Sequence, residues 1–303
     1  MSHIAIIGGG LIGASWVALF LAHGASVVAW DPIAAMRQSF AKRTEAMRRQ
    51  LRPLGLKAKG ELRVVATLAE AVQGAAWIQE NAPEQIPLKR ALYAEIEALN
   101  GKALIASSTS SFQWSELAAG MQRPNRLVVA HPFNPPHLVP LVEIYGRTKA
   151  AVDQAFAFYE GFGKAPIRIR REAAGHVANR LASALWREAV NIVAEGIADV
   201  ADVDKALVEG PGLRWAIQGA HMTYHLGGGS GGLKHYLEHL GQSQEKRWRS
   251  LGSPRLDAAT KRKLVQGIAK ESQGRSIEQL AAERDAMLLA LLKLKRPPVK
   301  RQK

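Results

Sequence analysis

The chain has 303 residues, of which 47% are hydrophobic, so it is long enough for about two domains with buried cores. It contains no cysteine, which excludes disulfides, a thiolate nucleophile and a thiolate metal site, and no metal is expected. The formal net charge is +15, but the excess lies partly in mixed helices and partly in the C-terminal run, as solvated charge usually does. We therefore predict no nucleic-acid partner.

The sequence also argues against a membrane protein. No apolar run reaches the roughly 18 residues that a membrane-spanning helix needs. The N-terminus, Met1-Ser2-His3, leads directly into an apolar segment, without the basic region and cleavage site of a signal peptide. We expect a cytoplasmic protein with no membrane partner.

The first half of the chain alternates short β-rich runs with helical stretches, a pattern typical of a doubly wound parallel sheet. Strands are predicted at residues 4–7, 27–30, 63–66, 77–80, 103–107, 127–131, 142–145 and 165–170. Helices are predicted between them, at residues 14–23, about 34–52 and 86–99. From residue 174 to 195 the apolar residues recur with helical period, and the sequence beyond indicates helix and loop.

These patterns predict an α/β fold, in which a Rossmann-type doubly wound sheet is followed by an all-α C-terminal domain. The change of character near residue 172 marks the expected boundary. We predict a sheet domain at residues 1–172, a helical domain at 173–292 and a flexible basic tail at 293–303.

A glycine-rich turn joins the first predicted strand to the first predicted helix. Residues 8–13 are Gly-Gly-Gly-Leu-Ile-Gly, which matches the G-x-G-x-x-G pattern between a strand and a helix. Gly8 permits the tight turn, Gly10 lets the backbone approach a pyrophosphate, and Gly13 lets the helix pack against the strand. The helix N-terminus offers N–H groups to the phosphates. The sequence predicts a dinucleotide site formed by Gly8, Gly10, Leu11, Ile12 and Gly13.

Asp31 identifies the dinucleotide. It ends the second predicted strand, about 20 residues beyond the glycines, where a carboxylate can accept hydrogen bonds from the ribose hydroxyls of NAD. The same carboxylate would repel the 2′-phosphate of NADP, and Pro32, rather than a basic residue, follows it. NAD is the predicted cofactor.

A histidine and a carboxylate stand at positions that suit nicotinamide chemistry, which needs a base for the alcohol proton. His131 lies at the end of a predicted strand, beyond which ligand crevices of open α/β sheets are found. Glu143 lies twelve residues later in an otherwise apolar strand, and a buried acid needs a partner. We predict that Glu143 orients His131 and raises its basicity.

Four segments, taken with the glycine turn, resemble the 3-hydroxyacyl-CoA dehydrogenase family. The segments are Ser107-Ser108-Thr109-Ser110-Ser111-Phe112, His131-Pro132-Phe133-Asn134-Pro135, Leu141-Val142-Glu143-Ile144 and Gly175-His176-Val177-Ala178-Asn179-Arg180. The family has S-N-T-S-S-L, H-F-F-N-P, L-V-E-V and G-x-x-x-N-R in the same order. The resemblance covers roughly residues 3–205 and implies an NAD-dependent enzyme that oxidises the hydroxyl of a 3-hydroxy acid or its derivative.

The resemblance also implies roles for individual residues. His131 would be the catalytic base and Glu143 its orienting partner, while Ser110 and Asn179 would hold the substrate oxygen near the nicotinamide. A hydroxyl and an amide can both donate to that oxygen without carrying charge. The family positions near the cofactor are matched by Glu84, Lys89 and Ser108, the last of which replaces the family's asparagine.

The C-terminal half contains the segments Arg214-Trp215-Ala216, Gly231-Gly232-Leu233-Lys234-His235-Tyr236 and Arg247-Trp248. These segments resemble a branch of the family that acts on free small molecules, which includes carnitine and L-gulonate 3-dehydrogenases and lens λ-crystallin. The resemblance implies L-carnitine as the substrate, and the residue types agree with it, because aromatic faces can hold its quaternary ammonium and an arginine its carboxylate. Arg214 is the candidate for the carboxylate. The candidates for the ammonium are Trp186, Trp215, Tyr224 and Trp248.

Other functions stay open at this point. A 3-hydroxyacyl-CoA, such as 3-hydroxybutyryl-CoA, or L-gulonate are the alternative substrates. A non-catalytic NAD-binding protein is the alternative of another class, and the set of Ser110, His131, Glu143 and Asn179 argues against it. A homodimer formed by the helical domain is expected from the family and from the apolar character of the long helix.

Overall fold

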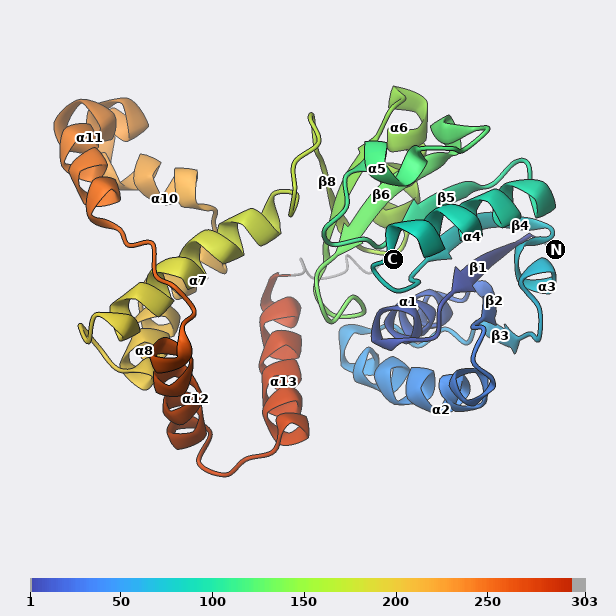
Figure 1. Ribbon diagram of the computed structural model, residues 1–303, viewed down its shortest axis with the longest axis horizontal. Coiled ribbons are helices and arrows are strands. Elements are labelled where there is room, and N and C mark those ends of the chain that lie inside the picture. The colour runs from blue at the N-terminus through green and yellow to red at the C-terminus, as the bar shows by residue number, and fades with distance from the viewer. Residues whose placement is uncertain (1, 296–303) are drawn as a thin grey trace, which may run out of the picture. The chain divides into compact units, whose positions relative to one another are not determined.

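The computed structural model describes residues 2–295, and its strands form one eight-stranded sheet (Figure 1). The strand order is β3-β2-β1-β4-β5-β6-β7-β8. The strands are β1 (His3–Ile7), β2 (Ser26–Trp30), β3 (Glu61–Val64), β4 (Ala75–Glu80), β5 (Leu104–Ser107), β6 (Leu127–Pro132), β7 (Leu141–Gly146) and β8 (Ala165–Arg168). All eight predicted strands are present, within a few residues of their predicted limits.

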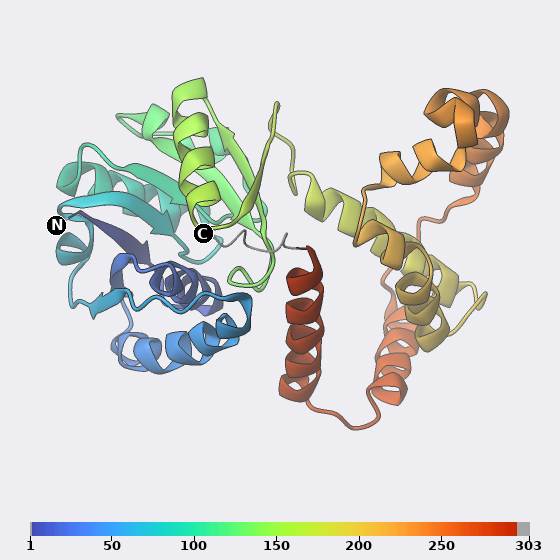
Figure 2. The same cartoon turned by 180° about the vertical axis from the view of Figure 1, so that it is seen from behind.

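Helices cover both faces of the sheet. One core cluster lies under α1 (Leu11–Ala22), α2 (Ala34–Gln50) and α6 (Lys149–Gly161). The other lies under α3 (Leu68–Val72), α4 (Ile86–Leu99) and α5 (Trp114–Ala118). Figure 1 has α4 and α5 in front of the strands, and Figure 2 has α6 in front. Because both faces are covered, β1, β5 and β6 are buried along their whole length and are almost continuously apolar.

The sheet is parallel except at one pair. The prediction of a parallel sheet needs a correction at β7, which runs antiparallel to β6. The connection between them, residues 133–140, is shorter than the roughly dozen residues that a parallel crossover needs. The chain therefore turns back directly, and β7 lies beside β6 with Glu143 opposite His131.

The topology also creates a crevice. From β1 the chain moves to β2 and β3 on one side, and β4 then returns to the other side of β1. The carboxyl ends of β1 and β4 meet at this switch point, where open α/β sheets bind their ligands. The glycine-rich turn follows β1, residues 81–85 follow β4 and residues 108–113 follow β5.

The rest of the described chain is helix and loop (Figure 2). One compact unit holds residues 2–180 and 285–295 of the described chain, and the other holds residues 181–284. The helices of this part are α7 (Ala178–Ala194), α8 (Val200–Glu209), α9 (Pro211–Trp215), α10 (Ala220–Gly227), α11 (Gly232–Ser250), α12 (Ala258–Ser272) and α13 (Ile277–Lys295). Short 3-10 turns lie here at Gly229–Gly231 and in the sheet domain at Arg52–Leu54 and Pro124–Arg126. None of the helices within residues 2–295 has the length and apolarity to cross a membrane.

Helix α13 belongs to both compact units, because it begins at Ile277 in the unit of residues 181–284 and its residues 285–295 belong to the first unit. Helix α13 returns to the first unit, where Leu289 and Leu292 pack against the core cluster under α1 and α2. Of the predicted basic tail, Lys293 to Lys295 end α13, and residues 296–303 lie outside the described residues.

Candidate active site

The glycine-rich turn is shaped by close backbone contacts. A Cβ on Gly8, whose φ is +95°, would lie 2.7 Å from the carbonyl oxygen of Asn81. A Cβ on Gly13 would lie 1.9 Å from the carbonyl oxygen of Gly8. Nothing lies within 4 Å of a Cβ on Gly10, which is the N-cap of α1 and leaves the first turn without a side-chain cap. The turn therefore leaves open the space and the N–H groups that a pyrophosphate needs.

Asp31 closes the turn from the end of β2. Its side chain accepts hydrogen bonds from the backbone N–H of Gly9 (2.7 Å) and of Ile33 (2.8 Å). Arg37 donates to the carbonyl oxygen of Asp31 (2.7 Å), and Arg43 donates to that of Gly9 (2.5 Å). These bonds hold the Asp31 carboxylate at the crevice, where the sequence predicts the adenosine ribose of the cofactor.

His131 and Glu143 form a buried pair. The Nδ1 atom of His131 lies 2.8 Å from Oε2 of Glu143. The other oxygen of Glu143 accepts hydrogen bonds from the N–H groups of Val177 (2.8 Å) and Ala178 (2.9 Å), at the start of α7. Burial raises the pKa of Glu143, but the hydrogen bond from His131 and the two backbone bonds outweigh it, so the pKa lies below its usual value.

The pair has a defined direction. An ionised carboxylate only accepts hydrogen bonds, so Nδ1 of His131 must be the donor. A neutral imidazole has a single N–H, and Nε2 of His131 then carries a lone pair that can accept a proton. Because Glu143 also accepts from the N–H groups of Val177 and Ala178, one carboxylate positions both the imidazole and the backbone next to Asn179.

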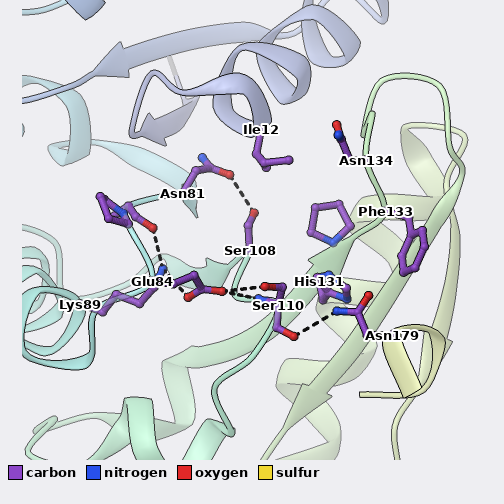
Figure 3. Close-up of a pocket in the computed structure, with 13 residues that line it drawn as sticks. Ile12, Asn81, Glu84, Lys89, Ser108, Ser110, His131, Phe133, Asn134 and Asn179 are labelled. Carbon is purple, nitrogen blue, oxygen red and sulfur yellow. Dashed lines mark hydrogen bonds and ion pairs between the residues drawn. The ribbon is translucent and has the colours of Figure 1, made fainter. Parts of the chain in front are cut away.

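His131 opens on a cavity of about 530 Å³ at the carboxyl edge of the sheet (Figure 3). Its lining comes from the glycine turn, from the segments after β4, β5 and β6, and from the start of α7. The lining residues are Ile12, Asn81, Ala82, Pro83, Glu84, Lys89, Ser108, Ser110, His131, Pro132, Phe133, Asn134 and Asn179. The structure thus brings together the predicted base, both predicted oxygen-binding residues and four of the predicted cofactor residues.

Glu84 is the centre of the hydrogen bonds in this cavity (Figure 3). It accepts hydrogen bonds from the N–H (2.5 Å) and hydroxyl (3.1 Å) of Ser110. It also accepts one from the hydroxyl of Thr109 (3.0 Å). The Nζ atom of Lys89 lies 3.7 Å from the same carboxylate. The amide of Asn179 donates to the carbonyl oxygen of Ser110 (3.3 Å). Glu84 and Asn179 therefore both bind Ser110 in the segment after β5, which places Ser110 and Asn179 next to each other.

Glu80 was missed in the sequence. It is fully buried at the end of β4 and accepts four hydrogen bonds. The donors are Nζ of Lys89 (2.7 Å), the N–H of Ala82 (2.6 Å), and the hydroxyls of Tyr93 (2.6 Å) and Ser107 (2.7 Å). Burial and the negative charge of Glu80 raise the pKa of Tyr93. A carboxylate at the end of an apolar strand is the same signal that singled out Glu143, and it would have found Glu80.

His176 was also missed. It is buried, its φ is +53°, and its ring centroid lies 5.1 Å from that of His131. Its Nε2 donates to the carbonyl oxygen of Thr109 (3.2 Å), and burial together with His131 lowers its pKa. The sequence carries no signal for it, because His176 occupies a variable position of the G-x-x-x-N-R motif.

The predicted substrate residues beyond Asn179 lie in the unit of residues 181–284. Trp186 is 57% exposed and lines an apolar pocket between α7, α8 and α12. Arg214 and Trp215 end α9, and Tyr224 of α10 packs on Tyr236 with ring centroids 5.0 Å apart. Because these residues lie in the other unit from His131, their contact with substrate stays a prediction.

The chain matches known families over most of its length. Residues 3–173 match the family model of the 3-hydroxyacyl-CoA dehydrogenase NAD binding domain, and residues 175–270 match that of the C-terminal domain. The chain belongs to the 3-hydroxyacyl-CoA dehydrogenase family. This confirms the resemblance noted in the sequence, the α/β fold with a helical C-terminal domain, and NAD as the cofactor. The 3-hydroxyacyl-CoA dehydrogenase family consists of NAD-dependent oxidoreductases, and this chain is one of them.

Similar members of this family span nearly the whole chain. The L-carnitine dehydrogenase of Nocardiopsis dassonvillei is 45% identical over 296 residues, which cover 95% of this chain and 90% of that protein. The L-carnitine dehydrogenase of Oceanobacillus iheyensis is 41% identical over 301 residues, which cover 97% of this chain and 98% of that protein.

Solved structures show the same fold. The crystal structure of an NAD⁺-dependent dismutase, 5-formyl-3-hydroxy-2-methylpyridine 4-carboxylic acid 5-dehydrogenase, matches with a TM-score of 0.82 and 26% identity, over 98% of this chain and all of that chain. The 3-hydroxybutyryl-CoA dehydrogenase of Escherichia coli K12 matches with a TM-score of 0.61 and 26% identity, over 69% of this chain and 46% of that chain.

Proposed function

We propose that this protein oxidises the 3-hydroxyl of L-carnitine to the ketone, 3-dehydrocarnitine, with NAD. The observation that carries the reaction is the buried pair of His131 and Glu143 at the mouth of a cavity shared with Ser110 and Asn179. The observation that favours the substrate is the similarity over nearly the whole chain to relatives named L-carnitine dehydrogenase.

In this proposal Nε2 of His131 takes the proton of the substrate hydroxyl. Glu143 stabilises the imidazolium that forms, because the carboxylate is ionised and lies 2.8 Å from Nδ1. Ser110 and Asn179 hold the substrate oxygen as neutral donors. Bound NAD supplies the acceptor for the hydride. The open space at Gly10 and the uncapped N-terminus of α1 fit its pyrophosphate, and the carboxylate of Asp31 fits its ribose.

The role of Glu84 and Lys89 follows from their position. Glu84 accepts hydrogen bonds from the N–H and hydroxyl of Ser110, and the buried Glu80 accepts one from Nζ of Lys89. We infer that this pair positions the segment after β5 against the nicotinamide half of the cofactor, beside Ser108. Arg214, Trp186, Trp215 and Tyr224 remain the proposed contacts for the two charged ends of carnitine.

A substrate panel tests the proposal. The purified full chain is incubated with NAD and with L-carnitine, L-gulonate or 3-hydroxybutyryl-CoA, and the absorbance of NADH is followed. The proposal expects the highest kcat/KM for L-carnitine. A higher kcat/KM for the CoA ester or for gulonate would support dehydrogenase activity but contradict L-carnitine as the substrate. Absence of turnover on all three compounds would contradict the whole proposal.

We also propose that the protein works as a cytoplasmic homodimer. Apolar side chains are exposed on α7 and α12 in the unit of residues 181–284, and a second copy would bury them. They include Leu181, Leu185, Val265 and Ile268. Light scattering of the purified chain should give twice the mass of 32.9 kDa, and a monomer mass would contradict the dimer. Cell fractionation tests the location.

A further inference from the structure

The connection between β6 and β7 carries two cavity residues but is held from outside the cavity. Phe133 and Asn134 line the cavity beside His131. A few residues further along the same connection, His137 is buried and points away from the cavity lining, toward α1 and α2. The proposed function assigns no role to His137.

His137 is bound on both ring nitrogens. Its Nδ1 lies 2.5 Å from the hydroxyl of Ser15, and its Nε2 lies 2.7 Å from Oε1 of Gln50. Its backbone N–H also donates to the hydroxyl of Ser15 (3.1 Å). Ser15 is fully buried in α1, the helix that begins at the glycine-rich turn. The connection is thereby tied to the helix proposed to hold the cofactor phosphates.

The hydrogen bonds continue to the end of the chain. The amide nitrogen of Gln50, at the end of α2, donates to Oδ2 of Asp285 in α13 (3.2 Å). The carboxylate can only accept, so the amide of Gln50 has one orientation and its oxygen faces His137. Nε2 of His137 must then donate, and Nδ1 accepts the hydroxyl hydrogen of Ser15. Three hydrogen bonds with defined donors thus connect four side chains in a row, those of Ser15, His137, Gln50 and Asp285. We call these four residues the anchor chain.

The buried side chain of Lys164 also binds the backbone of the connection between β6 and β7. Nζ of Lys164 donates to the carbonyl oxygens of Pro136 (2.6 Å) and Val139, and it lies 5.3 Å from the ring centroid of Trp16. Lys164 precedes β8 and has no place in the cavity lining. The backbone on both sides of His137 is therefore fixed by buried polar groups, which a loop needed only for connection would not require.

We propose that His137 is a positioning residue for the reaction, and that the anchor chain makes the placement of Phe133 and Asn134 depend on α13. The proposal rests on the proposed function for its kinetic readout, because it assumes that the cavity at His131 is the reaction site. The placement of the connection is independent of that assumption. Residues 285–295 would then serve the active site from the far end of the sequence, through Gln50 and His137.

The test uses the full chain with single substitutions along the anchor chain. Gln50→Leu separates His137 from α13 but keeps the Ser15 contact, and Asp285→Ala removes the acceptor of the Gln50 amide. Asp285→Asn keeps an oxygen that can accept from Gln50 and is the rescue variant. Glu283→Ala is the matched control, because Glu283 lies on the same helix in an exposed pair with Arg275.

Amide hydrogen exchange provides a readout that needs no substrate. The amides of His137, Leu138 and Val139 are bonded to Ser15 and to the carbonyl of Pro135, so they report the order of the connection directly. Exchange at these amides should be faster in Gln50→Leu and Asp285→Ala than in the wild type, and unchanged in Asp285→Asn and Glu283→Ala. Unchanged exchange in Gln50→Leu and Asp285→Ala would overturn the proposal.

Kinetics then tests the link to the reaction. Gln50→Leu and Asp285→Ala should lower kcat/KM for the alcohol about fivefold, the factor expected for one hydrogen bond, while the Kd for NAD stays close to wild type. Faster exchange with unchanged kcat/KM would overturn the positioning role. If the wild type turns over none of the three alcohols, the proposed function fails, and exchange still decides whether α13 orders the connection.

Discussion

His131 and Glu143 lie directly opposite each other in the antiparallel ladder of β6 and β7, with Nδ1 of His131 2.8 Å from the Glu143 carboxylate. Opposite residues of two antiparallel strands project from the same face of the sheet. The short connection at residues 133–140 therefore does more than return the chain, because it places an acid beside a histidine at the edge of the cofactor crevice.

Replacing the proposed base should remove turnover without removing cofactor. We expect His131→Ala to lower kcat by about 10²- to 10⁴-fold, the usual contribution of a general base, because the variant lacks the proposed acceptor of the hydroxyl proton. The Kd for NAD, measured by fluorescence titration, should stay within about twofold of wild type. His239→Ala, an exposed histidine of α11, is the control and should leave both values unchanged. An equal loss of turnover and NAD affinity would mean that His131 holds the cofactor instead.

Glu143 should make stability depend on pH in the acid range. Its folded-state pKa lies below the usual 4.5, because the bonds from His131, Ala178 and Val177 outweigh burial. Such a carboxyl stabilises the fold above its unfolded pKa, and this stabilisation is lost as pH falls through the folded value. Glu143→Gln should therefore be less stable than wild type by about 1–3 kcal/mol at neutral pH, and the difference should shrink below pH 4.5.

Urea denaturation of the two proteins at a series of pH values measures this difference. The free energy of unfolding of the wild type should fall more steeply on acidification than that of Glu143→Gln. Two curves that run parallel through the acid range would show that the Glu143 carboxylate makes no net contribution that depends on its charge.

The glycine-rich turn offers a matched pair of substitutions. Gly13→Ala places a methyl group 1.9 Å from the carbonyl oxygen of Gly8, so the variant should be strongly destabilised or fail to fold. Gly10→Ala meets no atom within 4 Å, so its Tm should match wild type while its affinity for NAD falls. Thermal denaturation and NAD titration separate the two effects. Undiminished NAD affinity in Gly10→Ala would place the pyrophosphate elsewhere.

Asp31 should control the choice between NAD and NADP. Asp31→Asn removes the negative charge that repels a 2′-phosphate and weakens a charged acceptor for the ribose hydroxyls. We expect the Kd for NAD to rise about tenfold, and the preference for NAD over NADP to shrink. Asp153→Asn, an exposed carboxylate of α6, is the control. A variant that retains the full wild-type preference for NAD would show that another group discriminates between the cofactors.

Several features of this protein could be predicted from local sequence, because they depend on residues close together in the chain. The alternation of apolar runs and helical periods indicates a Rossmann-type sheet followed by helices, and all eight strands are present where they were predicted. Gly8, Gly10 and Gly13 act within one turn, so their spacing alone marks the dinucleotide site. Asp31 follows from its distance to that turn.

The tertiary structure decided the rest, because it depends on which distant segments the fold brings together. The imidazole of His176 beside that of His131, and the packing of Leu289 and Leu292 of α13 against the core of the first unit, have no local signature. Hydrogen bonds such as that between Gln50 and Asp285 join residues 235 positions apart. Sequence patterns report which faces are apolar, whereas the partner of a buried polar group is set only when packing brings its donor and acceptor within reach.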